Sequence, residues 1–246
     1  MGNSIKKVGG LGMFHTPPIH RLEKFMIPST ANIACDSFVE SLLRLLSLRD
    51  IETEEHTRRV AALSLDLARA YGKFSHAELF DIYQGALIHD VGKIGIPDAV
   101  LQKRGSLTPE EEAQIRMHPI YAYELFRTLP CFEPILDIAY CHHEKWDGSG
   151  YPRGLRGEQI PLMARLFTIA DVWDALTSER PYRAPWPEEK VHDYILEQSG
   201  KYFDPAIVKL FISRYFRRST PRKSAKKFIG YTTLQQKVNL FIGEGR

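Results

Sequence analysis

Apolar residues recur every three or four positions along most of this chain, and that spacing constrains its fold more than any other feature. Phe38, Leu42 and Leu45 show the pattern, and Val60 and Leu63 begin a second run of it. Side chains at this spacing lie on one face of an α-helix, whereas a half-buried strand alternates at every second residue. No alternating run of strand length stands out in the sequence. The sequence therefore predicts an all-α protein.

Capping signals place several helix boundaries. Ser75 can cap a helix that runs to His89, after which the glycines and proline of "DVGKIGIP" stop it. Thr108-Pro109-Glu110-Glu111 is a capping box with proline at the first helical position, and Asp204-Pro205 is a second cap followed by proline. Further helices are expected at about 119–128, 134–143, 161–178 and 187–198 from their apolar spacing.

Composition divides the chain into three parts. With 246 residues and 43% apolar content, the chain can bury the core of one large domain, which we place at residues 35–216. Residues 1–34, rich in Gly, Pro, Lys and His, are expected to form a flexible lead-in. Residues 217–246 begin with a basic cluster; contact with an acidic partner is one interpretation, and a solvated tail is the simpler one.

Three cysteines, Cys35, Cys131 and Cys141, form no paired framework and no C-x-x-C motif. We therefore expect free, mostly buried thiols and a reducing compartment. The N-terminus has no continuous apolar stretch of a signal peptide, and no later segment has the length of a membrane span. A cytoplasmic protein without a transmembrane segment is the prediction. The net charge of +3 does not by itself indicate a nucleic-acid partner.

Five histidines stand at the edges of the predicted helices, and three acids are suitably placed to join them. The candidate metal ligands are Glu52, His56, His89, Asp90, His118, His142, His143 and Asp171. Glu52 and His56 are four residues apart and would share a helix face. Each residue alone has an ordinary structural alternative: His118 could mark a helix boundary, and Asp171 could cap a helix or pair with Arg165. Together they favour a metal site.

The donor set contains imidazoles and carboxylates but no thiolate. This disfavours a structural zinc site and suits iron or manganese. So many ligands would oversupply one ion, which indicates two or three divalent metal ions with Asp90 as a bridge. Centres with two metals typically catalyse in-line displacement at phosphorus, so phosphate esters are the expected substrates.

Six ordered blocks of this sequence resemble the HD-GYP family of HD-superfamily phosphohydrolases: "EEHTRRVA", "ALIHDVGKIGIPDAVLQKRGSLTPEE", "MHP", "HHEKWDGSGYPRGLRGEQIPL", "IADVWDALTSERPYR" and "FDP". The resemblance implies an all-α HD-domain helical bundle with a GYP loop extension, and 35–216 as its catalytic domain. Ala122 departs from the family pattern, which has glycine there. Many family members carry a receiver or sensor domain ahead of the catalytic one, for which the residues before position 52 leave no room. We therefore expect either control by a regulatory protein partner or no such control.

The resemblance also implies roles for individual residues. The seven ligand candidates other than Glu52 stand where the family's metal ligands stand, and Glu52 matches the extra ligand of members with three metals. Lys93 matches a lysine that faces the reacting phosphate. Arg180 and Arg183 match basic positions near the second phosphate or the guanine.

The expected function is therefore a phosphodiesterase that hydrolyses cyclic di-GMP to pGpG, and on to GMP, through water activated by the metals. Asp90 and Lys93 are the catalytic candidates, and Lys93, Tyr151, Arg180 and Arg183 the substrate-binding ones. Two alternatives stay open: a cyclic di-GMP receptor that does not hydrolyse its ligand, and a hydrolase of another cyclic dinucleotide or nucleotide.

Gly148 and Gly150 are expected to allow positive φ in the loop that holds Tyr151, whose ring contacts substrate or packs under the loop. A homodimer is also left open.

Overall fold

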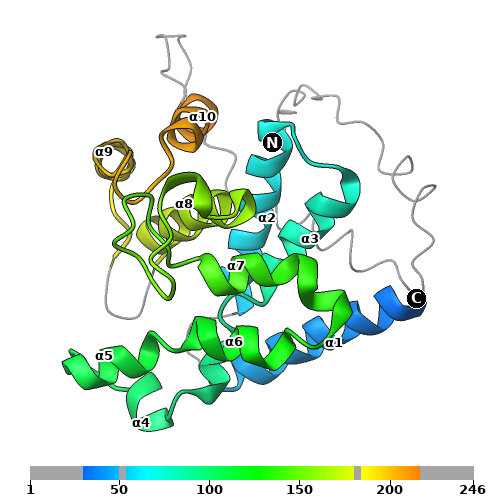
Figure 1. Cartoon of the computed structure of the whole chain (residues 1–246). Coiled ribbons are helices and arrows are strands. Elements are labelled where there is room, and N and C mark those ends of the chain that lie inside the picture. Colours follow the sequence, from blue (N-terminus) through cyan, green and yellow to red (C-terminus); the bar gives the residue numbers. More distant parts are fainter. Residues whose placement is uncertain (1–29, 50–53, 180–183, 217–246) are drawn as a thin grey trace, which may run out of the picture.

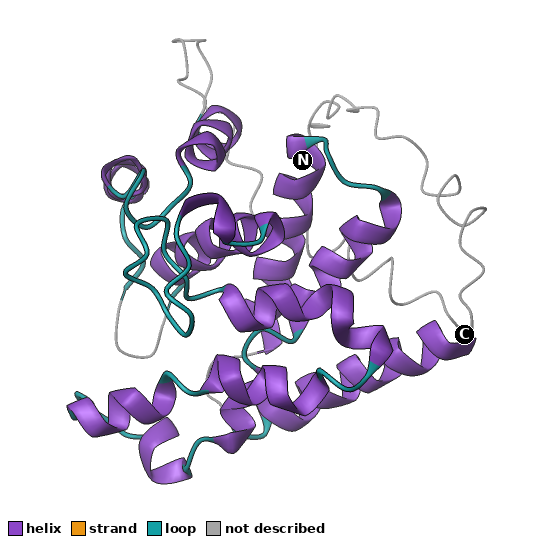
Figure 2. Cartoon of the chain, in the orientation of Figure 1, coloured by secondary structure: helices purple, strands orange, loops and turns teal. Residues whose placement is uncertain are grey.

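The computed structural model describes residues 30–49, 54–179 and 184–216, and helices connected by loops make up this part of the chain (Figures 1 and 2). Within these ranges the only β-type pairing is an isolated bridge between Ser199 and Phe203. The all-α prediction is confirmed. In chain order the elements are α1 (Thr30–Ser47), α2 (Glu54–Tyr71), α3 (His76–Leu87), the 3-10 helix η2 (Val91–Gly95), α4 (Asp98–Leu101), α5 (Pro109–Ile115), α6 (His118–Phe126), η3 (Pro130–Ile135), α7 (Leu136–Cys141), η4 (Gly157–Gln159), α8 (Leu162–Thr177), α9 (Glu188–Glu197) and α10 (Pro205–Tyr215).

The predicted caps form as expected. The Ser75 side chain accepts a hydrogen bond from the Glu78 backbone N–H, and Glu78 accepts one from the Ser75 N–H in return. Thr108 and Glu111 make the same reciprocal pair at the start of α5. Asp204 accepts a hydrogen bond from the N–H of Ala206 at the start of α10. These bonds satisfy amides that have no partner within their own helix.

The core lies where α2, α3, α7 and α8 meet, in the middle of the view in Figure 1. Leu67, Ile82, Ile138 and Phe167, one from each helix, are completely buried there. Burying a side chain of this size contributes about 1.5–3 kcal/mol relative to leaving it exposed. Helices α1 and α6 lie along one side of this core, and α9 and α10 lie at the other end (Figure 1). The central four helices therefore form the frame against which the other elements pack.

Some boundaries differ from the expectation. Helix α1 begins at Thr30, before the predicted domain start, and Phe38 and Leu45 on it are about half exposed although their spacing predicted burial. The helix expected at 134–143 is preceded by η3, which contains Pro130 and Pro134; proline lacks the backbone N–H that an α-helix needs. The short elements η2 and α4 were not predicted.

A disulfide joins Cys35 in α1 to Cys131 in η3. The expectation of three free thiols is therefore wrong for two of them. The two cysteines are separated by 96 residues, and only the packing of α1 against η3 brings them together. Cys141 is free and buried, as expected, and burial raises the pKa of its thiol to about 12.

None of the helices in the described ranges is both long enough and apolar enough to cross a membrane. The lead-in up to residue 29 and the basic tail from residue 217 lie outside the described residues. The three-part domain division and the cytoplasmic location stay predictions.

Candidate metal centre

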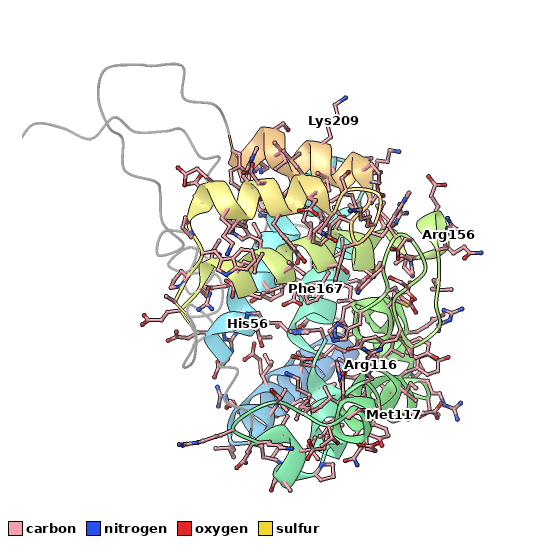
Figure 3. The ribbon with its side chains drawn as sticks, turned by 90° about the vertical axis from the view of Figure 1, so that its left-hand side faces the viewer. His56, Arg116, Met117, Arg156, Phe167 and Lys209 are labelled. Atoms are coloured by element: carbon pink, nitrogen blue, oxygen red, sulfur yellow. A yellow bond between two sulfur atoms is a disulfide. The ribbon has the colours of Figure 1, made fainter. Side chains whose placement is uncertain are left out.

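Five parts of the fold deliver histidines and aspartates to one place. His56 lies in the first turn of α2, and His89 and Asp90 lie in the turn between α3 and η2. His118 begins α6, His142 and His143 follow α7, and Asp171 lies on α8. We call these seven residues the histidine–aspartate centre. In Figure 3, His56 lies near the middle of the molecule, and Phe167 of the core lies above it and to its right.

The centre contains two groups of three residues, each with ligand atoms within 4.8 Å of one another. The first group is His118, His142 and His143, and the second is His56, His89 and Asp171. Asp90 lies between them: its Oδ1 is 3.2 Å from His118 Nε2, and its Oδ2 is 3.2 Å from His89 Nε2. One carboxylate therefore faces both groups, which is the placement a bridging ligand requires.

Backbone carbonyls orient three of the imidazoles. Each of His89, His118 and His142 uses Nδ1 to bond a carbonyl three residues earlier, on Ala86, Ile115 and Ala139, at 2.7, 2.7 and 3.0 Å. A carbonyl only accepts hydrogen bonds, so Nδ1 carries a proton in each case. The Nε2 atoms face the centre, and Nε2 is one of the two imidazole nitrogens that bind metals.

The first group shows that a cation fits. His118 Nε2 and His142 Nε2 lie 3.1 Å apart. Burial lowers the pKa of His118, and burial together with His143 holds the pKa of His142 well below its ordinary value. Both rings are therefore neutral near pH 7, and two lone pairs face each other. A shared cation relieves that repulsion. Burial likewise lowers the pKa of His143 to about 3.

In the second group, imidazoles face carboxylates. His56 Nε2 lies 3.3 Å from Asp171 Oδ1. Burial opposes the charge of His56, but hydrogen bonds to Asp171 and Asp174 outweigh it and raise the pKa to about 10. Burial also opposes the charge of Asp90, yet the positive charges of Lys93 and His89 hold the pKa of this carboxyl well below its usual range. The carboxylates of Asp171 and Asp90 thus favour a positive charge beside the imidazoles of His56 and His89, so this group also fits a divalent cation.

Lys93 extends from η2 into the centre. Its Nζ lies 2.9 Å from Asp90 Oδ2, and its side chain is only 12% exposed. The structure thus brings Lys93 together with the histidine–aspartate centre. Arg165 pairs with Asp204 at 2.6 Å, so the pairing of Asp171 with Arg165 considered from the sequence does not form.

The loop after His143 folds back on the histidines. The buried carboxylate of Glu144 accepts hydrogen bonds from the backbone N–H groups of Arg153 and Leu155, at 2.7 and 3.0 Å. Gly148 has φ +82°, as predicted, but Gly150 is not among the glycines with positive φ. Gly150 is needed for another reason: a Cβ there would lie 2.3 Å from the Lys145 nitrogen and 2.5 Å from the His143 oxygen.

Tyr151 packs at the edge of the first group. Its ring stacks on His143 with the ring centroids 4.7 Å apart, and its N–H donates to the His143 carbonyl at 3.2 Å. The guanidinium of Arg116, labelled in Figure 3, lies 5.1 Å from the centroid of the same ring. Burial raises the pKa of the Tyr151 hydroxyl to about 12, so the hydroxyl keeps its proton at neutral pH.

Sequence reasoning missed two buried acids near the centre, Asp174 and Glu144. Asp174, which is completely buried, bonds His56 and Arg59. It follows Asp171 by three residues on α8, and this i, i+3 spacing could have indicated it. Glu144 carries no such signal, because its burial depends on the path of the loop.

Three predicted residues, Glu52, Arg180 and Arg183, lie outside the described residues.

Comparison with known proteins gives consistent matches. The family model for the HD domain matches residues 40–207, more than half of the chain. A cyclic di-GMP phosphodiesterase of Thermotoga maritima is 37% identical over 211 residues, covering 81% of this chain and 57% of the relative. A 3'3'-cGAMP-specific phosphodiesterase 2 of Vibrio cholerae is 38% identical over 179 residues, covering 72% of this chain and 34% of the relative. The chain thus spans about half or less of the length of these relatives.

Solved structures show the same fold. A HDG"Y"P protein from Bdellovibrio bacteriovorus aligns with a TM-score of 0.55 at 22% identity, over 74% of this chain and 62% of that one. A cyclic GMP-AMP specific phosphodiesterase of V. cholerae aligns with a TM-score of 0.53 at 23% identity, over 82% of this chain and 53% of that one. The arrangement of helices is therefore that of HD-domain proteins.

Proposed function

This chain belongs to the HD-GYP family of HD-domain proteins, and from that premise we propose that it is a metal-dependent phosphodiesterase of cyclic dinucleotides. The observation that carries the proposal is the position of Asp90 between two groups of histidines, with Lys93 beside it. Such an arrangement suits phosphate ester hydrolysis, in which two cations share the charge of one phosphate group.

In this proposal His118, His142 and His143 hold one divalent ion, His56, His89 and Asp171 hold another, and Asp90 serves both. Bound divalent ions would supply Lewis acidity, which neutralises phosphate charge and makes water more acidic. Iron or manganese is the proposed metal, because the donors are imidazole nitrogens and carboxylate oxygens. Glu52 is the proposed ligand to a third ion.

Lys93 adds a fixed positive charge. Its ammonium group is mostly shielded from water, so its attraction to a phosphate oxygen is weakened less by solvent than that of a surface lysine. The charge that develops on the non-bridging oxygens during displacement is therefore stabilised by a group already in place. Asp90 holds the ammonium at 2.9 Å and so fixes its position.

Cyclic di-GMP is the substrate we propose. Hydrolysis would form a bond between phosphorus and the oxygen of water and break the bond to the 3′ oxygen, which leaves with a proton. The first cut gives linear pGpG and a second gives GMP. Tyr151 at the first group, together with Arg180 and Arg183, is proposed to contact the nucleotide. A 3'3'-linked cyclic GMP-AMP is the second candidate, because relatives of similar identity carry that specificity in their names.

The test is hydrolysis of a panel of cyclic dinucleotides by protein purified without oxygen, with the metals of the same sample counted. We expect linear products from cyclic di-GMP and two or three metal ions per chain. His89→Ala and Asp90→Ala should abolish turnover while the helical content stays unchanged. Protein that holds its metals and binds cyclic di-GMP without cutting it would instead establish the receptor alternative. Faster cutting of cyclic GMP-AMP would reassign the substrate.

A further inference from the structure

A buried carboxylate lies behind His56, on the side of the ring away from the centre. Asp174 on α8 is completely buried, and its Oδ2 accepts a hydrogen bond from His56 Nδ1 at 2.7 Å. The other ring nitrogen of His56, Nε2, faces Asp171 Oδ1 at 3.3 Å. The imidazole is therefore held between two carboxylates of α8, one at each nitrogen.

His56 differs in this respect from His89, His118 and His142. Those three histidines bond a backbone carbonyl three residues earlier in the chain. The residue three positions before His56 lies outside the described residues, and His56 is in the first turn of α2. Among the described residues, the side chain of Asp174 is a hydrogen-bond partner of His56 Nδ1, the nitrogen that bonds a backbone carbonyl in the other three rings.

Arg59 fixes Asp174 in turn. Its Nε donates to Asp174 Oδ1 at 2.7 Å, and its second terminal nitrogen donates to Oδ2 at 2.9 Å. Arg59 lies three residues, slightly less than one turn, after His56 on α2, and Asp174 lies three residues after Asp171 on α8. Two neighbouring turns of α2 are thus joined to two neighbouring turns of α8, and the carboxylate cannot rotate away from the imidazole without breaking its pair with Arg59.

We propose that Asp174, held by Arg59, is a positioning residue that fixes the His56 ring with Nε2 toward the centre, and thereby sets the affinity of the ion held by His56, His89 and Asp171. The inference rests on the metal centre of the proposed function. A carboxylate on the outer nitrogen of a ligating histidine fixes its tautomer and orientation, and its loss typically weakens metal binding by about 10–100-fold. Asp174 bonds His56, which belongs to the other group, so the ion held by His118, His142 and His143 should bind as before.

A purely structural role is the competing explanation, because Asp174 also joins α2 to α8. Asp66 on α2 offers a matched control. It accepts hydrogen bonds from Arg214 of α10 at 2.8 and 2.6 Å, which is the same forked pairing between two helices. None of its partners is a residue of the histidine–aspartate centre.

The experiment is a titration of metal-free full-length protein with Mn²⁺, followed through the electron paramagnetic resonance signal of free Mn²⁺. We expect two tight sites in the wild type. Asp174→Ala should weaken one of them about 10–100-fold and leave the other unchanged. Asp66→Ala should leave both unchanged, even where it lowers the melting temperature. Asp174→Asn should lose less affinity than Asp174→Ala, since its amide oxygen can still accept from His56 Nδ1–H.

Two tight sites in Asp174→Ala, or equal weakening of both sites, would overturn the positioning role while leaving the metal centre in place. A wild type that binds no Mn²⁺ would instead overturn the metal centre, and the inference with it. If Asp174→Ala does not fold, Asp174→Asn and Arg59→Met decide the question by the same titration, with the same selective weakening expected.

Discussion

At the scale of single residues, Lys93 differs from the seven residues of the centre because its ammonium group has no lone pair and cannot bind a metal. We therefore predict that Lys93→Met lowers turnover of cyclic di-GMP while the metal content stays at the wild-type level. Removing one preorganised group that stabilises transition-state charge costs about 10²–10³ in turnover. The measurement is the rate of product formation, with metals counted on the same sample.

Lys103 provides the control for Lys93→Met. It forms a salt bridge with Glu111 near the surface, and its side chain is 32% exposed. Lys103→Met should keep wild-type turnover. Unchanged turnover in Lys93→Met would contradict the role of Lys93, and loss of metals in that variant would show that it acts by orienting Asp90.

Residue chemistry explains which parts of the centre the sequence could predict. Histidines beside carboxylates at helix ends are unusual enough to indicate metal ligands, and the structure brings His56, His89, His118, His142, His143, Asp90 and Asp171 together. Asp174 and Glu144 look like ordinary helix and loop acids. Their importance depends on what packs against them, which local sequence does not specify.

At the scale of elements, the contact between η2 and α6 sets how Asp90 faces His118. Gly92 allows that contact: a Cβ at this position would lie 1.9 Å from the His118 oxygen and 2.7 Å from the Ala122 nitrogen. Both atoms belong to the backbone of α6, so neither can rotate away. We predict that Gly92→Ala moves η2 away from α6, costs about 1–3 kcal/mol as an overpacked site, and weakens metal binding. Denaturant unfolding and metal titration measure the two effects.

Gly72 serves as the control for Gly92→Ala. It has φ +77° and nothing within 4 Å of an added Cβ. Gly72→Ala should be destabilised by about 1–2 kcal/mol through its backbone conformation alone and should bind metal normally. Normal metal binding by Gly92→Ala would show that the close approach of η2 to α6 does not set the geometry of the centre.

Local signals explain why most helices could be predicted and a few elements could not. The caps at Ser75, Thr108 and Asp204 are formed by residues a few positions apart, so the sequence itself contains both partners. The elements η2 and α4 are too short to show a period. Half-exposed Phe38 on α1 packs edge-to-face against Phe126 and Phe132, contacts that its spacing in the chain does not reveal.

At the scale of the whole molecule, contacts between distant segments were the least predictable. The Cys35–Cys131 disulfide depends on the path of the chain through α2 and α3, and no cysteine spacing indicates it. The centre shows the opposite case: its residues also come from distant parts of the chain, but their chemistry marks them as partners. The sequence thus predicted long-range contacts between residues whose types indicate a shared metal ion. It did not predict contacts that arise only from packing.

The centre also connects the parts of the fold, because its residues come from α2, the turn after α3, α6, the end of α7 and α8. An ion that binds only the folded chain stabilises it by about 2.7 kcal/mol when its free concentration is 100 times the dissociation constant. We predict that a chelator lowers the melting temperature and that Mn²⁺ restores it, as followed by circular dichroism. Asp90→Ala, which lacks the shared carboxylate, should respond to the chelator much less. Equal melting temperatures of the wild type with and without chelator would mean that bound ions do not contribute to the stability of the fold.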